Sequence, residues 1–266
     1  MTTETAAASA DPVWDEIRER AFEQASQEPM LASFLYATIL NHHSLEDALS
    51  FHLANKLESQ ALPAISVREV IDHALAQDSD IGAAVRADIQ AINERDSASC
   101  SLTTPFLFFK GFHALQAYRV AHWLWKNNRH AMALFLQNRI SMVFSVDIHP
   151  AAQIGRGIML DHGTGIVIGE TAVVEDDVSI MQAVTLGGTG KETGDRHPKV
   201  RSGVLISAGA KILGNIEIGH CAKVGAGSVV LHSVPARTTV AGVPAKVVGS
   251  ADCSHPSRAM NHTIEQ

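Results

Sequence analysis

Aliphatic residues recur at every sixth position through the second half of the chain. They form three runs: Ile148, Ile154, Leu160 and Ile166; Ile168, Val174, Ile180 and Leu186; Val200, Ile206, Ile212, Ile218, Val224 and Val230. Small or β-branched residues dominate four places after each aliphatic residue. A six-residue period does not suit an α-helix or the short strands of a β-sandwich, but it is typical of parallel β-helices. We therefore predict a parallel β-helix over residues 143–250.

The first half follows a helical period instead. Asp11-Pro12 offers an N-cap followed by a proline at the first helical position, and the segments 44–47 and 66–69 match the capping-box pattern. Aliphatic residues spaced for one helix face follow each of these starts. An apolar helix is predicted from Thr104 to Trp125, and a last one over about residues 129–143. Residues 1–142 are therefore predicted to form an all-α domain of about seven short helices.

Composition changes at the same boundary. All fourteen aromatic residues lie within the first 144 positions, and seventeen of the nineteen glycines lie after them. A narrow β-helix has little room for large rings and needs glycine at its corners. The two halves therefore pack by different rules, and residues 251–266 are left as a C-terminal tail.

Charge and cysteine content exclude several classes of protein. A net charge of −7 argues against a general nucleic-acid binder, whose surface is basic. The three cysteines, Cys100, Cys221 and Cys253, fit neither a disulfide framework nor a paired-cysteine metal site. The N-terminus resembles no signal peptide, and charged residues interrupt the most apolar stretch. We expect a cytoplasmic protein with no membrane or nucleic-acid partner.

One segment has no aliphatic residue and interrupts the repeats. Residues 187–199 are polar and rich in glycine, and they are too long for a corner of the β-helix. We expect this segment to leave the β-helix as a loop. Long loops on rigid scaffolds often carry function.

Polar residues at positions where the repeat otherwise has small or aliphatic residues are the candidate catalytic and binding residues. His162 follows Asp161 in a repeat position where a bulky polar group has no packing purpose, and a histidine of near-neutral pKa can deprotonate a hydroxyl or an amine. Arg196, in the interrupting loop, has a guanidinium suited to a carboxylate, and Asp96 with Asp161 suits an ammonium group. Together these residues suggest an amino-acid substrate that bears a nucleophile.

Several motifs resemble one family closely. The segments Val146-Asp-Ile-His-Pro-Ala-Ala152, Gly157-Ile-Met-Leu-Asp-His162, Thr185-Leu-Gly-Gly-Thr-Gly-Lys191 and Gly194-Asp-Arg-His-Pro-Lys199 are similar to those of serine O-acetyltransferases. Lys110-Gly-Phe-His113 and Ala241-Gly-Val-Pro-Ala-Lys246 also resemble this family, and the resemblance runs from about Trp14 to Thr263.

The resemblance implies a fold, an assembly and a reaction. It implies a left-handed β-helix and trimers that pair through the helical domains into hexamers, with active sites between neighbouring β-helices. The reaction implied is acetyl transfer from acetyl-CoA to the L-serine hydroxyl, the first step of cysteine biosynthesis, with cysteine as an inhibitor. No metal is expected.

The resemblance also assigns roles to individual residues. His162 is implied as general base and Asp147 as the carboxylate that orients it. Asp96 and Asp161 are implied to bind the serine ammonium group, and Arg196 and His197 its carboxylate. The coenzyme residues implied are Gly188, Ala208, Ala226 and Lys246.

The tail departs from the family pattern. Members that bind O-acetylserine sulfhydrylase end in isoleucine, whereas this sequence stops at Gln266. The missing isoleucine argues against such a complex.

The sequence leaves three other functions to compare with this one. An acyltransferase of the same superfamily acting on homoserine or a sugar is the main alternative. A zinc carbonic anhydrase on the same scaffold needs three converging histidines, and the repeats contain no close pair. A non-catalytic scaffold protein that only organises partners is the third alternative. It would give no role to the pair His162 and Asp147 or to the pair Arg196 and His197.

Overall fold

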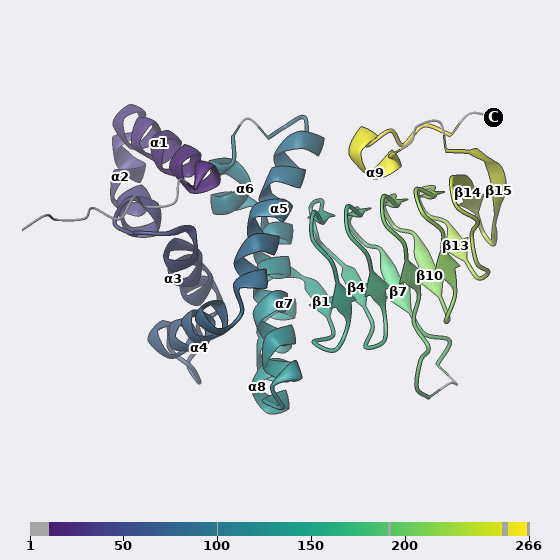
Figure 1. Cartoon of the computed structure of the whole chain (residues 1–266), viewed down its shortest axis with the longest axis horizontal. Coiled ribbons are helices and arrows are strands. Elements are labelled where there is room, and N and C mark those ends of the chain that lie inside the picture. The colour runs from purple at the N-terminus through teal and green to yellow at the C-terminus, as the bar shows by residue number, and fades with distance from the viewer. Residues whose placement is uncertain (1–10, 100, 191–192, 252–254, 265–266) are drawn as a thin grey trace, which may run out of the picture.

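The computed structural model describes residues 11–99, 101–190, 193–251 and 255–264. A helical region lies at one end of a parallel β-helix, and the C-terminal segment returns along the β-helix (Figure 1). The fold class expected from the sequence is confirmed. No helix in the described ranges is long and apolar enough to cross a membrane.

The helical region contains eight α-helices and one π-helical turn among the described residues before position 145. They are α1 (Pro12–Gln27), α2 (Pro29–Leu35), η1 (Tyr36–Leu40), α3 (Leu45–Leu57), α4 (Ala64–Gln77), α5 (Ser79–Arg95), α6 (Thr103–Phe108), α7 (Lys110–Lys126) and α8 (His130–Phe144). Two predicted caps are confirmed, because the Trp14 N–H donates to the Asp11 carboxylate and the Asp47 N–H donates to Ser44 Oγ.

Two helix predictions are wrong. The segment 66–69 does not begin a helix, since α4 already starts at Ala64 after the cap residue Pro63 and Ser66 lies within its first turn. The single helix predicted from Thr104 to Trp125 is two helices, α6 and α7, separated at Phe109, whose ψ of 107° is extended. Apolar periodicity continued through that break and hid it.

The β-helix has three faces, each a parallel sheet apart from one antiparallel edge strand. Face A contains β1 (Val146–Ile148), β4 (Ile166–Ile168), β7 (Thr185–Gly187), β10 (Lys211–Leu213) and β13 (Val229–Val230). Face B contains β2 (Gln153–Ile154), β5 (Val173–Val174), β8 (Lys199–Val200) and β11 (Glu217–Ile218). Face C contains β3 (Met159–Leu160), β6 (Ser179–Ile180), β9 (Leu205–Ile206), β12 (Lys223–Val224), β14 (Thr238–Gly242) and the antiparallel β15 (Ala245–Ser250).

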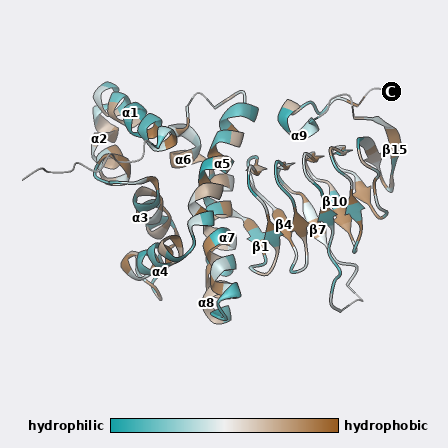
Figure 2. Cartoon of the chain, in the orientation of Figure 1, coloured by the Kyte–Doolittle hydropathy of each residue, from teal (hydrophilic) through white to brown (hydrophobic). Residues whose placement is uncertain are grey.

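The repeat aliphatics stack on one another inside these faces. Ile168 pairs with Leu186 and Leu186 with Ile212 on face A, and each of these side chains is at most 1% exposed. Figure 2 shows hydrophobic and hydrophilic residues mixed along the strands, as inward aliphatic and outward polar positions require. The hexad pattern therefore predicted the interior of the β-helix correctly.

One hydrophobic core runs through both regions. It includes Ile17 and Leu53 of the helical region and Ile180 and Ile206 of the β-helix. Only Ser145 separates α8 from β1. The division at residues 142 and 250 stays a prediction; α8 continues to Phe144, and β15 ends at Ser250.

The C-terminal segment lies against face C. The short helix α9 (Pro256–Ala259) is followed by His262, whose Nδ1 lies 2.9 Å from Ser207 Oγ, and the Lys223 ammonium donates to the Thr263 carbonyl. Cys100 and Cys253 lie outside the described residues, whereas Cys221 is buried.

Candidate active site

Asp161 and His162 occupy a corner with two more residues than the hexad spacing gives. Leu160 and Ile168 stack on Ile180 and Leu186 of the next coil, yet they lie eight positions apart instead of six. The longer turn places His162 in the left-handed backbone region, at a φ of 55°, with 69% of its side chain exposed. Such a conformation costs a non-glycine residue about 1 kcal/mol. The corner therefore presents an imidazole to solvent at an energetic cost.

Carboxylates gather at this corner, which we call the His162 corner (residues 161–165). Asp161 Oδ2 lies 3.7 Å from His162 Nε2, and the Asp161 side chain is only 18% exposed. Burial raises the pKa of the Asp161 carboxyl; His162 opposes this effect, and the nearby Asp96 carboxylate adds to it. The structure thus brings together Asp96, Asp161 and His162 within one chain. Two neighbouring carboxylates are a favourable place for an ammonium group.

Helix α7 packs against the His162 corner. A Cβ on Gly111 would lie 2.0 Å from the Leu160 carbonyl oxygen, so only glycine permits this approach of α7 to β3. The Lys110 ammonium donates to Thr164 Oγ1 in the same corner. The Lys-Gly pair of the Lys110–His113 motif therefore supports the corner that carries the imidazole.

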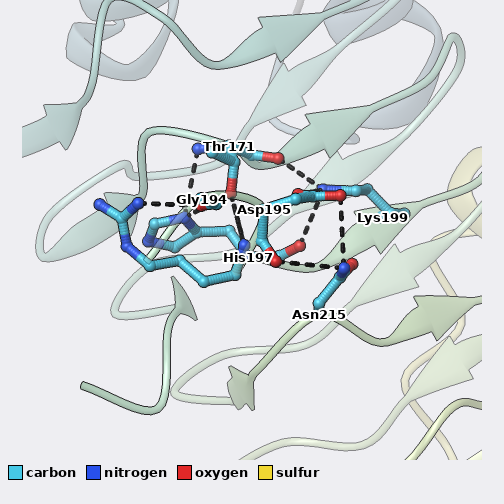
Figure 3. Close-up of polar contacts among 7 residues, drawn as sticks. Thr171, Gly194, Asp195, His197, Lys199 and Asn215 are labelled. Atoms are coloured by element: carbon cyan, nitrogen blue, oxygen red, sulfur yellow. Dashed lines mark hydrogen bonds and ion pairs between the residues drawn. The ribbon is translucent and has the colours of Figure 1, made fainter. Parts of the chain in front are cut away.

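The second group of candidates gathers where β7 leaves for the loop, and we call it the Arg196 corner (residues 169–171 and 194–199). Arg196 Nη2 lies 2.7 Å from Glu170 Oε2, and its Nη1 donates to the Gly194 carbonyl at 3.0 Å. Thr171 Oγ1 accepts the backbone N–H groups of Arg196 and His197 at 3.0 and 3.1 Å. Figure 3 shows dashed contacts from Thr171 to His197 and to Lys199. One hydroxyl thus fixes the backbone of both candidates.

His197 is oriented by the same threonine. Its Nδ1 accepts the Thr171 N–H at 3.2 Å and lies 2.9 Å from Thr171 Oγ1, so the ring proton belongs on Nε2. Burial and the neighbouring Arg196 guanidinium lower the pKa of His197. A Cβ on Gly169 would lie 2.0 Å from the ring, so the ring packs where glycine leaves room. His197 therefore offers a neutral N–H donor beside a guanidinium.

The base of the loop is closed by a third set of contacts. The Lys199 ammonium donates to the Asp195 carboxylate and to the Thr171 carbonyl, and Asn215 Nδ2 donates to the Asp195 carbonyl at 3.2 Å (Figure 3). The predicted loop over residues 187–199 falls on the connection from β7 to β8, with Gly187 and Lys199 inside those strands and residues 191–192 outside the described ranges.

The two corners lie at opposite ends of β4. The His162 corner precedes Ile166 and Glu170 follows Ile168, so face A separates the two corners in one chain. Asp147 lies between them, on the outer side of β1, where its Oδ1 accepts a hydrogen bond from Gln137 Nε2 at 2.8 Å. Within the described ranges no hydrogen bond or ion pair joins Asp147 to His162. One chain alone does not assemble the full set of candidates.

Three of the four candidate coenzyme residues lie along the edges of face A, and the fourth lies on face C. Ala208 and Ala226 occupy the corners after β9 and β12, in line with the His162 corner. Gly188 follows β7, and a Cβ there would lie 3.4 Å from Arg196 Cγ. Lys246 is exposed on β15 at the end of this β-helix.

Sequence reasoning missed the residues that hold the candidates in place. Thr171, Glu170 and Gly169 form the Arg196 corner, and Gln137 contacts Asp147. Their one sequence signal is that residues 169–171 occupy the corner directly before the interrupted coil. No group of three histidine, cysteine or carboxylate side chains in the described part of the chain is placed to hold a metal ion.

Known proteins resemble this chain over nearly its full length. A family model described as "Serine acetyltransferase, N-terminal" matches residues 13–117. The serine acetyltransferase of Escherichia coli (strain K12) is 60% identical over 260 residues, which cover 95% of each chain.

Solved structures agree in fold and sequence. A serine acetyltransferase in complex with cysteine has a TM-score of 0.93 and 58% identity, covering 95% of this chain and 98% of that one. The serine acetyltransferase of Brucella abortus strain S19 in complex with coenzyme A has a TM-score of 0.90 and 53% identity, covering 92% and 98% of the two chains. Identity at this level over almost the whole of both chains shows that the chain belongs to the serine acetyltransferase family.

Proposed function

We propose that this serine acetyltransferase transfers the acetyl group of acetyl-CoA to the L-serine hydroxyl with His162 as the general base. The observation that carries this assignment is the exposed imidazole beside the Asp96 and Asp161 carboxylates, at a corner with two extra residues. The serine ammonium group lies between the two carboxylates, which places the serine hydroxyl next to the imidazole.

The reaction needs one proton carrier. The imidazole takes the hydroxyl proton as the serine oxygen attacks the thioester carbonyl carbon. The tetrahedral intermediate then collapses, the carbon–sulfur bond breaks, and the imidazolium returns the proton to the departing CoA thiolate. The products are O-acetylserine and CoA, and His162 ends as it began.

A neighbouring copy supplies the rest of the site. Arg196 and His197 are suited to the serine carboxylate, but they lie at the other end of β4 from His162. The outer side of face A and the adjoining helix α8 expose apolar side chains, including Val167, Leu231 and Met142. A cyclic trimer that buries this surface brings the His162 corner of one copy to the Arg196 corner of the next. Asp147 of the neighbour then orients His162, and pairing of helical regions gives the hexamer.

Acetyl-CoA binds along the edge between faces C and A. The backbone N–H groups of Ala208 and Ala226 make no hydrogen bond within the described part of the chain, so both are available to the amide carbonyls of the pantetheine arm. Gly188, beside Arg196, leaves room on the facing edge, and Lys246, exposed on β15, binds a CoA phosphate in this proposal. The CoA-bound relative supports this use of the fold.

Cysteine inhibits by occupying the serine site. It has the same ammonium and carboxylate groups as serine, with a thiol in place of the hydroxyl, and a relative has been solved with cysteine bound.

Substitution of the base tests the assignment. Asparagine suits the left-handed backbone at position 162, so His162→Asn removes the base with little strain. Thiol release from acetyl-CoA in the presence of serine should fall about a hundred- to ten-thousandfold, the usual contribution of a positioned base. Homoserine and sugars serve as acceptor controls, and cysteine as competitor. Wild-type turnover in the folded variant would refute the role of His162, and faster turnover with homoserine would refute serine as the acceptor.

A further inference from the structure

Arg95 is a buried cation next to a residue of the proposed serine site. It is the last residue of α5 and directly precedes Asp96, and its side chain is only 1% exposed. Burial of an unpaired charge is costly, so its partners must compensate for the lost hydration. The position of those partners shows what this arginine connects.

The guanidinium of Arg95 joins α5 to two coils of the β-helix. Nη1 donates to the Gly157 carbonyl at 2.9 Å and to Ser179 Oγ at 3.1 Å, and Nη2 lies 2.9 Å from Asp177 Oδ1. Gly157 belongs to the first coil, whereas Asp177 and Ser179 belong to the second. Arg95 therefore fixes the end of α5 directly on the coils that carry and stack on Asp161.

The C-terminal helix α9 covers this junction. Asp177 also forms an ion pair with Arg258, whose Nη2 lies 3.1 Å from Asp177 Oδ2. Ser179 Oγ donates to the Ser257 carbonyl at 2.9 Å. Arg258 is 53% exposed, unlike Arg95. The two arginines share one carboxylate, but Arg95 connects it to α5 and Arg258 connects it to α9.

Two forces act against the position of Asp96. It is the C-cap of α5, where the partial negative charge of the helix end disfavours a carboxylate. It also lies within electrostatic range of Asp161, a second carboxylate. The repulsion between the two carboxylates pushes the end of α5 away from the His162 corner. Among the described residues, the Asp96 carboxylate accepts the Ala98 N–H at 2.8 Å, a contact within its own segment.

We propose that Arg95 is the positioning residue of the serine ammonium site, holding the end of α5 so that Asp96 faces Asp161 across the substrate. This inference rests on the proposed function, in which those two carboxylates bind the ammonium group. Arg95 touches neither substrate, because its side chain is only 1% exposed and both Nη atoms donate to acceptors of the β-helix. It acts through Asp96.

A double-mutant cycle on the full-length enzyme tests the inference. Asp96→Asn should raise the KM for serine about ten- to a hundredfold, the loss expected for a contact to a charged group. Arg95→Met should raise the same KM about tenfold and leave the KM for acetyl-CoA unchanged. Because Arg95 acts through Asp96, the double variant should bind serine no more weakly than Asp96→Asn alone. Arg258→Met is the matched control and should leave both KM values unchanged.

The outcomes separate this inference from the proposed function. An unchanged serine KM in Asp96→Asn refutes the ammonium site itself and the role of Arg95 with it. If Asp96→Asn weakens serine binding but Arg95→Met does not, or if the two effects multiply, Arg95 is not the positioning residue. If Arg95→Met does not fold, Arg95→Lys replaces it, because lysine keeps the charge but cannot reach all three acceptors. The serine KM of Arg95→Lys is then measured alone and combined with Asp96→Asn, and the same outcomes apply.

Discussion

At the scale of single residues, Asp161 is in an unfavourable place for a carboxylate. Burial raises its pKa, and the Asp96 carboxylate adds to that effect although His162 opposes it. Since the folded protein holds this proton more tightly than the unfolded chain, stability falls as the pH rises from the ordinary carboxyl pKa through the raised one. At neutral pH the ionised Asp161 therefore lowers the free energy of unfolding. A bound ammonium group would reverse that cost.

Asp161→Asn should separate stability from function. The variant should have a higher Tm than the wild type at pH 7 and lose that advantage at about pH 3, below the ordinary carboxyl pKa. Its KM for serine should rise about tenfold or more, because one partner of the ammonium group has lost its charge. Thermal unfolding at the two pH values and steady-state kinetics provide the measurements. Asp72→Asn, on the half-exposed face of α4, is the control and should alter neither. A lower Tm at pH 7 would contradict the electrostatic argument.

The chemical groups were easier to predict than their supports. Asp161, His162, Arg196 and His197 stand out because a β-helix repeat has no packing use for them. Thr171 does not stand out, since threonine is common at such corners. Its role depends on two backbone N–H groups that lie 25 and 26 residues away in sequence, and only the stacking of coils brings these together.

At the scale of elements, the breaks in the hexad register coincide with the candidate site. Leu160 and Ile168 are eight positions apart at the His162 corner, and Leu186 and Val200 are fourteen apart across the loop. From Val200 to Val230 the six-residue register is kept, so the extra residues lie at the two corners that carry the candidate groups. The sequence predicts the break between Leu186 and Val200 as a loop. The break between Leu160 and Ile168 is visible in the sequence only as a change from one six-residue register to another, and which aliphatic residues stack across it is seen only in the structure.

Helix boundaries were less accessible from the sequence. The capping pattern at residues 66–69 is overridden by Pro63, which starts α4 three residues earlier. The break at Phe109 ends α6 and lets α7 begin at Lys110, next to the close approach of Gly111 to β3. Both errors arose because local propensity competes with contacts that form only in the folded chain.

The contact of α7 with β3 predicts an effect of Gly111→Ala on catalysis. The new Cβ would lie 2.0 Å from the Leu160 carbonyl oxygen, so α7 or the His162 corner must shift. A displacement of about 1 Å can cost a hundredfold in rate, and we expect kcat/KM for serine to fall by about that factor. Gly82→Ala in α5 is the matched control, because the nearest neighbours of its Cβ outside the α5 backbone would be the flexible side-chain tips of Glu46 and Arg86. Equal effects of both variants would mean that the contact at Leu160 has no special role.

At the scale of the whole molecule, composition and period predicted the architecture. An aromatic-free, glycine-rich half with a six-residue period leaves few folds besides a parallel β-helix, and the structure has that fold. The spatial relation of the candidate residues was not accessible in the same way. Both corners lie close in sequence, with eight residues from His162 to Glu170, yet strand β4 carries the chain from one edge to the other between them.

That separation makes mixed oligomers the decisive test of a shared site. His162→Asn and Arg196→Ala should each be nearly inactive alone, the first in turnover and the second at limiting serine. If each site combines the His162 corner of one copy with the Arg196 corner of the next, random mixing in a cyclic trimer leaves about a quarter of the sites with both groups intact. Co-expressing the two variants should therefore restore about a quarter of the wild-type activity, since one neighbouring pair in four has the right order. A mixture of the separately purified variants, kept from exchanging subunits, is the control and should stay inactive. If co-expression restores nothing while mixed oligomers form, both corners must act within one chain, and the trimeric site is wrong.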